Sequence, residues 1–402
     1  MDVRDRVRGC LLGGAIGDAL GAPIEFQSLR EIRRDHGADG ISGYVTTWRG
    51  KTGLITDDTQ MTLFTVEGLL AARAATAQAS GAGGEGLGAA REPAEVVGAV
   101  REPAEVIGAV RQAYLRWLDT QRNPDPPPAA LPHQTGRLRE EAWLYSRRAP
   151  GSACLSGLHR PFPGPAAWGE PGPVNPDSKG CGTVMRSAPF GLDRAAGPSR
   201  PERGSAGGPS DPGRATTGEP SDPGRGTTGE PSGPGRIDAR EAFELAAACA
   251  QITHGHPTGY LAAGAFAAII ARLMAGESLE PAVRQAMDLL STYPGHDETI
   301  TALRAALLLA ATGEHSPEAV ESLGGAWVAE EALAIGVYCA LVEPAVDKAL
   351  LLSVNHSGDS DSTGSVCGNL LGALHGAAAL PAAWLEPLEG RDTLERLAAE
   401  LA

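Results

Sequence analysis

Two short acidic runs restrict what this chain can fold into more than any other feature. Residues 56–59 read Thr-Asp-Asp-Thr, and residues 358–364 read Gly-Asp-Ser-Asp-Ser-Thr-Gly. Each run precedes an apolar segment rich in small residues, 61–70 and 366–374, of the kind that forms a buried helix. Carboxylates at the start of a buried helix are costly unless they are neutralised, and bound divalent cations would do so. The two runs therefore predict two halves of one cation site that the fold must bring together.

Each run taken alone has a simpler interpretation. The side chains of Asp, Ser and Thr often cap helices or stabilise turns by accepting hydrogen bonds from free backbone N–H groups. A dedicated calcium loop is not expected, because an EF-hand spreads its ligands over about twelve positions and ends them with Glu. Helix capping and cation binding both remain open from the residues alone.

The rest of the chain has the pattern of helices. Segments 260–275, 303–311, 326–342 and 345–354 are rich in Ala and Leu and show no sustained two-residue alternation. Hydrophobic residues make up 42% of the 402 residues but aromatic residues only 4%, which favours tightly packed helices with small and aliphatic side chains. We expect an all-α fold with a single domain over residues 1–402.

Two low-complexity insertions interrupt this domain, at about 76–100 and 195–236. Residues 91–100 and 101–110 are near copies with Pro and Glu where a helix begins, and only the second copy is needed to start the helix that follows. Residues 195–236 repeat Pro, Gly, Ser and charged residues and have almost no apolar side chains to offset the entropy of ordering. We expect a disordered loop there, with a partner-binding tail as the alternative.

Charge and composition narrow the class of protein. The formal net charge of −15 argues against nonspecific binding to nucleic acid or to anionic membranes, although a substrate carrying a pyrophosphate is not excluded. No apolar stretch reads as an unbroken membrane span and the first six residues do not resemble a signal peptide, so we expect a cytoplasmic protein. The six cysteines are scattered without CxxC pairs, which predicts reduced thiols and no zinc.

Five sequence blocks occur in an informative order. They are Gly9–Phe26, Thr56–Met61, Gly180–Arg186, Thr253–Pro257 and Gly358–Gly364. In this order they resemble the ADP-ribosylglycohydrolases, which include the dinitrogenase-reductase-activating glycohydrolase and the vertebrate ADP-ribosyl-acceptor hydrolases. Residues 325–333 are similar to a late core helix of the same family. The resemblance spans nearly the whole chain and implies an orthogonal helical bundle in which both acidic runs meet at one cleft.

The resemblance also implies a ligand set for two cations. Oxygen ligands suit Mg²⁺, with Mn²⁺ as the alternative. Asp361 would bridge the two ions, and the other ligands would divide into Asp359 and Ser362 for one ion and Thr56, Asp57 and Asp58 for the other. Relatives often have Thr where Ser362 stands, and either hydroxyl can bind a cation. The ions would orient the ribose hydroxyls and the attacking water.

Glu25 joins Asp57, Asp58 and Asp361 in the predicted catalytic set. It lies between apolar Ile24 and Phe26 and could be an ordinary exposed residue at a helix end. The matching family position is a mobile glutamate near the metals, which implies a role in gating or proton transfer. Asp18, by contrast, could be structural.

The predicted substrate-binding residues are Gly180, Cys181, Gly182 and His254. The two glycines would let the backbone approach a phosphate, with N–H donors exposed if a helix starts at Thr183. The family more often has Asn where Cys181 stands. His254 resembles a family histidine that contacts the distal part of ADP-ribose, although a histidine beside an apolar helix is more often structural.

These features predict a monomeric, metal-dependent hydrolase that removes ADP-ribose from a modified acceptor. A protein side chain is the expected acceptor, and arginine is favoured over serine because of the acidic surplus and the form of the 358–364 run. Two alternatives remain: a hydrolase of a free ADP-ribosylated small molecule or nucleic acid, and a noncatalytic protein that binds ADP-ribose. Membranes are not expected partners.

Overall fold

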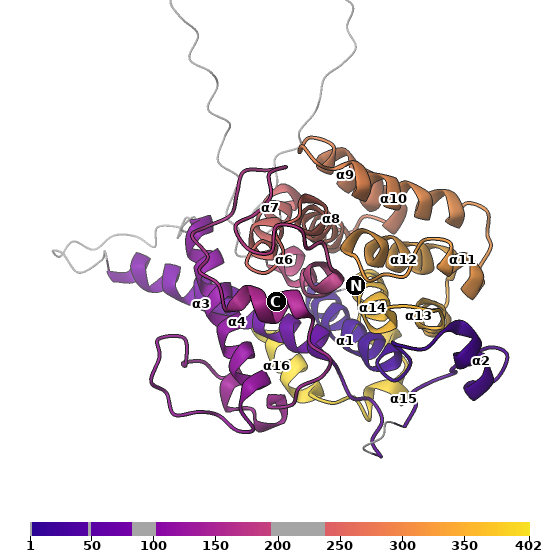
Figure 1. Ribbon diagram of the computed structural model, residues 1–402, viewed down its shortest axis with the longest axis horizontal. Helices are drawn as coiled ribbons and strands as arrows, with labels where there is room; N and C mark the ends of the chain where they lie inside the picture. Colours follow the sequence, from indigo (N-terminus) through magenta and orange to yellow (C-terminus); the bar gives the residue numbers. More distant parts are fainter. Residues whose placement is uncertain (1, 47–49, 83–101, 194–237) are drawn as a thin grey trace, which may run out of the picture.

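The computed structural model describes residues 2–46, 50–82, 102–193 and 238–402 (Figure 1). Within these ranges the chain forms sixteen α-helices and four short 3₁₀ helices and no named strand, and one antiparallel bridge joins Gly180 to Val328. The protein is an all-α orthogonal bundle, which confirms the predicted fold class.

The helices follow one another along the chain with these bounds. They are α1 Val3–Gly21, α2 Leu29–His36, α3 Asp57–Ala82, α4 Pro103–Arg122, η1 Leu138–Glu140, η2 Ala142–Leu144, α5 Ser152–Leu158, η3 Cys181–Arg186, α6 Ala188–Leu192, α7 Ala239–Ala250, α8 Pro257–Met274, α9 Leu279–Leu290, α10 Asp297–Ala310, α11 Pro317–Glu321, α12 Ala329–Val342, α13 Val346–Val354, α14 Ser360–His375, η4 Ala377–Ala379, α15 Ala382–Leu385 and α16 Arg391–Leu401.

The helices predicted from composition are present, with shifted starts: α8 and α10 begin three and six residues before the predicted segments 260–275 and 303–311. The predicted segments lie in α8, α10, α12 and α13, and α3 and α14 begin at the two acidic runs. Helix α12 begins at Ala329, three residues later than predicted, because residues 326–328 are used elsewhere. Cys181 N–H donates to the Trp327 carbonyl at 3.2 Å, and Ala329 N–H donates to the Lys179 carbonyl at 2.8 Å. This short pairing holds the segment before α12 against residues 179–181.

Helices α1 and α14 form the central contact of the bundle (Figure 1). Glycines recur at every fourth position on both helices, and the helices run antiparallel so that these glycines face one another. A Cβ atom would lie 1.9 Å from the Gly364 carbonyl oxygen if placed on Gly17, and 2.3 Å from the Gly368 carbonyl oxygen if placed on Gly13. The two backbones therefore touch directly, at a distance that no side chain larger than hydrogen permits.

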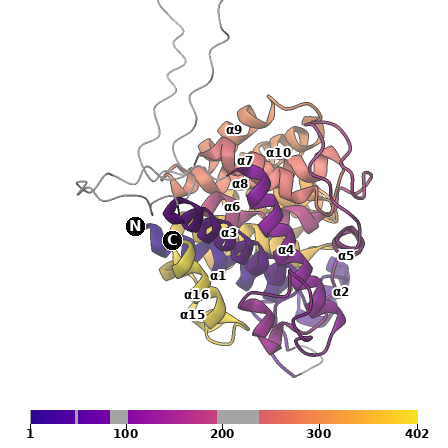
Figure 2. The same cartoon turned by 90° about the vertical axis from the view of Figure 1, so that its left-hand side faces the viewer.

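The other helices surround this pair. Helices α3 and α4 pack against each other on one side, where Figure 2 shows them in front of α1. Helices α10, α11 and α12 lie on the opposite side in Figure 1. The carboxyl end of α1 and the amino end of α14 meet at the same end of the central pair, and the acidic runs gather there.

Helix α8 corrects one statement made from the sequence. By length and hydropathy alone Pro257–Met274 could cross a membrane, which the sequence analysis did not recognise. In the structure 83% of this helix is buried, and it packs against α6, α7, α9 and α12. Its apolar surface is used inside the bundle, as expected for a core helix.

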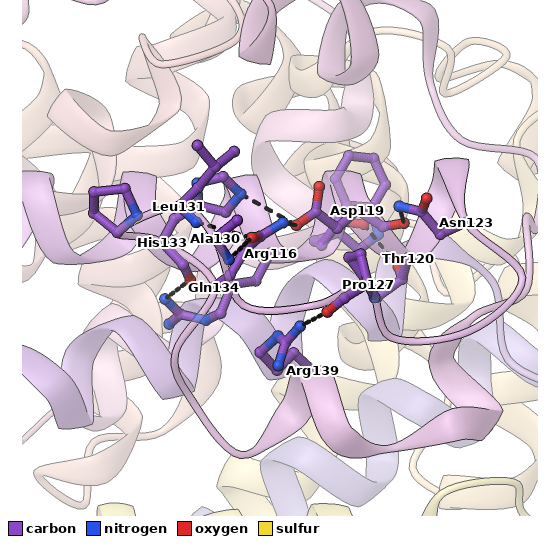
Figure 3. A network of polar contacts seen from close by, with 12 residues as sticks. Arg116, Asp119, Thr120, Asn123, Pro127, Ala130, Leu131, His133, Gln134 and Arg139 are labelled. Carbon is purple, nitrogen blue, oxygen red and sulfur yellow. Dashed lines mark hydrogen bonds and ion pairs between the residues drawn. The ribbon is translucent and has the colours of Figure 1, made fainter.

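The Pro-rich stretch after α4 is an ordered loop, and Figure 3 shows the contacts that hold it. The Asp119 carboxylate lies 3.1 Å from His133 Nε2 and accepts a hydrogen bond from Gln134 Nε2 at 3.1 Å. Arg116 donates to the His133 carbonyl, and Arg139 donates to the Pro127 carbonyl. These bonds fasten the loop to α4. Farther along the chain, residues 149–153 form one wall of the cavity described below.

The predicted insertions fall largely outside the described residues. Residues 76–82 continue α3, and the second repeat copy starts α4 at Pro103, as predicted. The rest of the first predicted insertion and all of the second lie in residues 83–101 and 194–237, which the structure does not describe. All six cysteines are free.

The contact between α1 and α14 leads to a test of the fold. Gly17→Ala places a methyl group where the Gly364 carbonyl stands, so we expect the free energy of unfolding to fall by ~3 kcal/mol. Gly108→Ala is the matched control, since a Cβ at that helical position meets nothing within 4 Å. The control should raise stability by up to ~1 kcal/mol. Urea denaturation followed by circular dichroism measures both, and equal stability of Gly17→Ala and the wild type would contradict the direct backbone contact.

Candidate active site

The two acidic runs meet in the folded chain. Helix α3 begins at Asp57, and α14 begins at Ser360 with Asp359 at its N-cap. The Ser362 hydroxyl donates to the Asp58 carboxylate at 3.0 Å across a separation of 304 residues. The two acidic runs, expected from the sequence to converge, therefore lie together at this end of the bundle.

Helix capping, the simpler interpretation of these runs, is also present. Thr56 Oγ1 accepts a hydrogen bond from the Asp58 N–H at 3.2 Å, and Asp359 Oδ1 accepts one from the Ser362 N–H at 3.3 Å. Capping occupies only some of the oxygens. The two interpretations are compatible, because one side chain can cap its helix and still present an oxygen to a shared cavity.

A cavity of about 380 Å³ lies where the runs meet, a size that suits a small ligand. All predicted site residues except Thr56 line it. On its acidic side lie Glu25, Asp57, Asp58, Asp359, Asp361 and Ser362, and on its neutral side lie Gly180, Cys181, Gly182 and His254. Thr56 instead lines a neighbouring cavity of about 620 Å³, which shares Glu25, Phe26 and Ala149 with the first.

Glu25 is part of the acidic cluster and not an ordinary surface residue. Its side chain is buried, and oxygens of Glu25, Asp359 and Asp361 all lie within 4.8 Å of one another. Burial, and then the nearby carboxylates of Asp359, Asp57 and Asp18, raise the pKa of Glu25 to about 9. Without a bound cation this carboxyl therefore holds a proton at neutral pH.

Three other carboxyl groups of the cavity are affected in the same way. Burial and mutual repulsion raise the pKa values of Asp57, Asp58 and Asp361 well above the usual range. None of these three, nor Glu25 or Asp359, forms an ion pair with a described residue. A buried, uncompensated set of oxygen donors fits a hard divalent cation such as Mg²⁺ or Mn²⁺.

Cys181 brings a sulfur atom into contact with the cluster. Its thiol donates to Asp359 Oδ2 at 2.8 Å. Burial and the nearby carboxylates of Asp359 and Asp58 raise the pKa of this thiol. The thiol therefore stays protonated beside Asp359 and acts as a hydrogen-bond donor.

Asp18 has the structural role that the sequence left open. Its carboxylate accepts hydrogen bonds from the N–H groups of Thr56 and Thr59 and from the Thr59 hydroxyl. These bonds fasten the carboxyl end of α1 to the start of α3. Burial outweighs them and raises the pKa of Asp18 to about 6.

The neutral side of the cavity is built from η3 and the segment before α8. Helix η3 begins at Cys181, two residues before the predicted start at Thr183. A Cβ atom on Gly180 or Gly182 would lie 3.2 or 3.3 Å from His254 Nε2, so both positions favour glycine. Burial and Arg186 lower the pKa of His254 to about 3, which keeps its ring uncharged.

Two aromatic rings stand at the mouth of the cavity. Phe26 and Trp327 stack with ring centroids 5.7 Å apart and an interplanar angle of 19°. Both rings are exposed, and both line the cavity. Both residues lie in family-like segments of the sequence, but nothing in either segment indicates a partner some 300 positions away.

Comparison with known proteins identifies the family. The model of the ADP-ribosylglycohydrolase family matches residues 1–206 and 231–402, nearly the whole chain. The chain belongs to the ADP-ribosylglycohydrolase family.

Individual relatives match shorter stretches. The ADP-ribosyl-[dinitrogen reductase] glycohydrolase of Rhodospirillum rubrum is 46% identical over 61 residues, which cover 15% of this chain and 21% of that protein. An uncharacterized protein of Archaeoglobus fulgidus is 35% identical over 83 residues, or 21% of this chain and 27% of that protein. The matched stretches thus span about a quarter or less of these curated relatives.

The fold is similar to that of a solved family structure. A chain described as an ADP-ribosylglycohydrolase-related protein complex aligns over 99% of this chain and 97% of its own length, with a TM-score of 0.55 and 21% sequence identity. This similarity supports the orthogonal helical bundle.

The raised pKa values predict how stability depends on pH when no divalent cation is present. The folded pKa of Glu25, about 9, exceeds its ordinary value of 4.5, and that of Asp18, about 6, exceeds 3.8. Protonation of these groups therefore stabilises the fold fully below the ordinary values, and this contribution is lost as the pH rises through the folded values. In EDTA, we expect the melting temperature to fall between pH 5 and pH 9.

Glu25→Gln provides the control for this prediction. The amide has nearly the same shape and cannot ionise, so the melting temperature of the variant should fall less steeply over the same pH range. Thermal unfolding followed by circular dichroism measures both proteins. Parallel pH profiles would show that Glu25 does not titrate in this range.

Proposed function

We propose that this member of the ADP-ribosylglycohydrolase family is a hydrolase that requires divalent cations and cleaves the glycosidic bond between ADP-ribose and a modified protein side chain. One observation carries the proposal: a single cavity has a side of buried, unpaired carboxylates and an opposite side of glycines and a neutral histidine. ADP-ribose has a matching division, with ribose hydroxyls near the bond to be broken and a diphosphate farther away.

The acidic side would hold the cations. Asp57, Asp58, Asp359, Asp361 and Ser362 present their oxygens to the cavity, and Thr56 adjoins them at the start of α3. When bound, two such ions would offset the negative charge, orient the ribose hydroxyls and lower the pKa of a bound water. The oxygen-rich donor set supports Mg²⁺ as the resident ion, with Mn²⁺ as the alternative.

Glu25 is placed to move a proton during cleavage. Its carboxyl group lies among the acidic residues and also borders the second cavity. A carboxyl whose pKa is raised can donate a proton to the departing acceptor atom and then take one from the attacking water. Glu25 would thus serve as general acid and then as general base in hydrolysis.

The neutral side would accept the diphosphate. Buried carboxylates repel phosphate, so the anion is expected to lie away from them, beside Gly180, Gly182 and His254. The glycines lack side chains that would block close approach of an oxygen to the backbone. This placement orients the ribose end of the ligand toward Glu25 and the acidic residues.

Arginine is the acceptor that the charge of the site favours. The guanidinium stays protonated in proteins, and a carboxylate-rich cleft tolerates a departing cation. Five buried carboxylates in one cavity therefore support an arginine-linked substrate over a serine-linked one.

Asp361 is the position at which cation dependence is tested most directly. Asp361→Asn should lower the rate of ADP-ribose release at least ~10³-fold, because the carboxylate of Asp361 would help to hold the cations that supply charge stabilisation. It should also abolish the rise in melting temperature that Mg²⁺ gives the wild type. Release of ADP-ribose and thermal unfolding with and without Mg²⁺ measure the two effects.

Asp347→Asn is a matched control for this variant. Asp347 also lies in the first turn of a helix, α13, but it is exposed and lines neither of the two cavities. It should keep wild-type activity and the response to Mg²⁺. Full activity of Asp361→Asn, or of the wild type in excess EDTA, would overturn the proposed dependence on cations.

A substrate panel tests the acceptor. Peptides of matched sequence that carry ADP-ribose on arginine or on serine should be cleaved at different rates in Mg²⁺, with the arginine-linked peptide the faster. A small ADP-ribosylated molecule and an ADP-ribosylated oligonucleotide complete the panel. A preference for any other member would reassign the acceptor, and binding of ADP-ribose without cleavage of any substrate would indicate a noncatalytic protein.

A further inference from the structure

Arg186 is a buried cation in an unusual setting. Its side chain is 1% exposed and forms no ion pair with a described residue. Its Cζ lies 4.6 Å from the centre of the Tyr114 ring, and its Nη1 lies 3.3 Å from Cys154 Sγ and 3.4 Å from Met61 Sδ. A buried charge without a carboxylate partner is costly. The shortest hydrogen bond of Arg186 is donated by Nη2 to the Thr253 hydroxyl, at 2.5 Å.

The Thr253 hydroxyl links Arg186 to His254. Thr253 Oγ1 lies 2.8 Å from His254 Nδ1. A guanidinium has only donors, so Oγ1 must accept from Arg186. The single hydroxyl proton of Thr253 then has two possible acceptors: His254 Nδ1 at 2.8 Å and the Ala250 carbonyl at 3.4 Å. The shorter bond is much the stronger, so the proton is directed to Nδ1.

This arrangement determines which ring nitrogen of His254 carries a proton. The ring is neutral, so a Nδ1 that accepts leaves the hydrogen on Nε2. In the opposite tautomer both Arg186 and Nδ1–H would donate to Oγ1, and the Thr253 hydroxyl would be left with only the 3.4 Å bond. The Nε2–H form therefore satisfies all three groups and the Nδ1–H form does not.

Nε2 points to the neutral side of the cavity. It lies 3.2 Å from where a Cβ on Gly180 would stand and 3.3 Å from where one on Gly182 would stand, and all three residues line the cavity. Within the described parts of the chain no side chain or backbone group hydrogen-bonds to Nε2. A neutral N–H donor thus faces open space on the side away from the carboxylates.

We propose that Arg186 and Thr253 are positioning residues that hold His254 in its Nε2–H form, so that the ring donates a hydrogen bond to an anionic oxygen of a diphosphate ligand. The identity of that ligand rests on the proposed function. The tautomer does not, because it follows from contacts within the protein. The opposite tautomer would present a lone pair to the anion and repel it.

Long-range ¹H–¹⁵N NMR of the histidine rings in the full-length protein tests the tautomer directly. His254 is assigned from the spectrum of His254→Gln. The wild type should show a protonated Nε2 and an unprotonated Nδ1, unchanged down to pH 5. Thr253→Val, which has the same shape but no hydroxyl, should give a mixture of tautomers, and Thr253→Ser should restore the wild-type signals. Arg186→Met removes the donors at similar volume and should also admit the Nδ1–H form.

Calorimetric titration with ADP-ribose tests the consequence for binding. Thr253→Val should weaken binding about tenfold, the usual effect of losing one well-placed hydrogen bond, and Thr253→Ser should bind as the wild type does. A wild-type spectrum with the proton on Nδ1 would overturn the proposal even if the variants failed to fold. So would unchanged tautomer and affinity in Thr253→Val. If the wild type does not bind ADP-ribose, the proposed function fails, while the spectra still decide the tautomer.

Discussion

The direct backbone contact between α1 and α14 is the constraint on which the site depends. Because glycines face one another along both helices, the helices approach more closely than side chains would permit. This brings the carboxyl end of α1, which carries Asp18, against the amino end of α14, which carries Asp361. Asp18 in turn binds the backbone at Thr56 and Thr59 and brings the first acidic run into place. One close contact thus assembles three segments that are far apart in the sequence.

The cost of this assembly is electrostatic. Glu25, Asp57, Asp58 and Asp361 are buried together, and their pKa values rise because neither water nor a positive side chain compensates their charges. Protons can relieve the repulsion at low pH, and divalent cations would relieve it at neutral pH. The instability of the empty cluster and its proposed affinity for cations have the same origin. A cation that binds this cluster and relieves the repulsion would therefore stabilise the folded protein.

The buried positive charge of Arg186 has a different use. This residue lies under the neutral side of the cavity and contacts a hydroxyl, two sulfur atoms and an aromatic ring, none of which is an anion. An arginine placed among the carboxylates would compete with cations for them. At its actual position it instead orders Thr253 and His254. The cavity therefore keeps its two sides chemically distinct, with anionic oxygens on one and a neutral donor on the other.

The sequence by itself determined the helical class, because long Ala- and Leu-rich segments without alternation leave little choice of secondary structure. It also indicated the acidic runs and the blocks that contain Glu25, Gly180 and His254, since these residue types are informative even in isolation. It did not reveal the pairing of α1 with α14, although the glycines at every fourth position in both segments were a visible signal. The separation of Thr56 from the main cavity and the roles of Asp18 and Arg186 were decided only by the tertiary structure. The reason is physical: a carboxylate, a threonine or an arginine has no fixed role until the fold sets its burial and its partners, and those partners lie tens to hundreds of residues away.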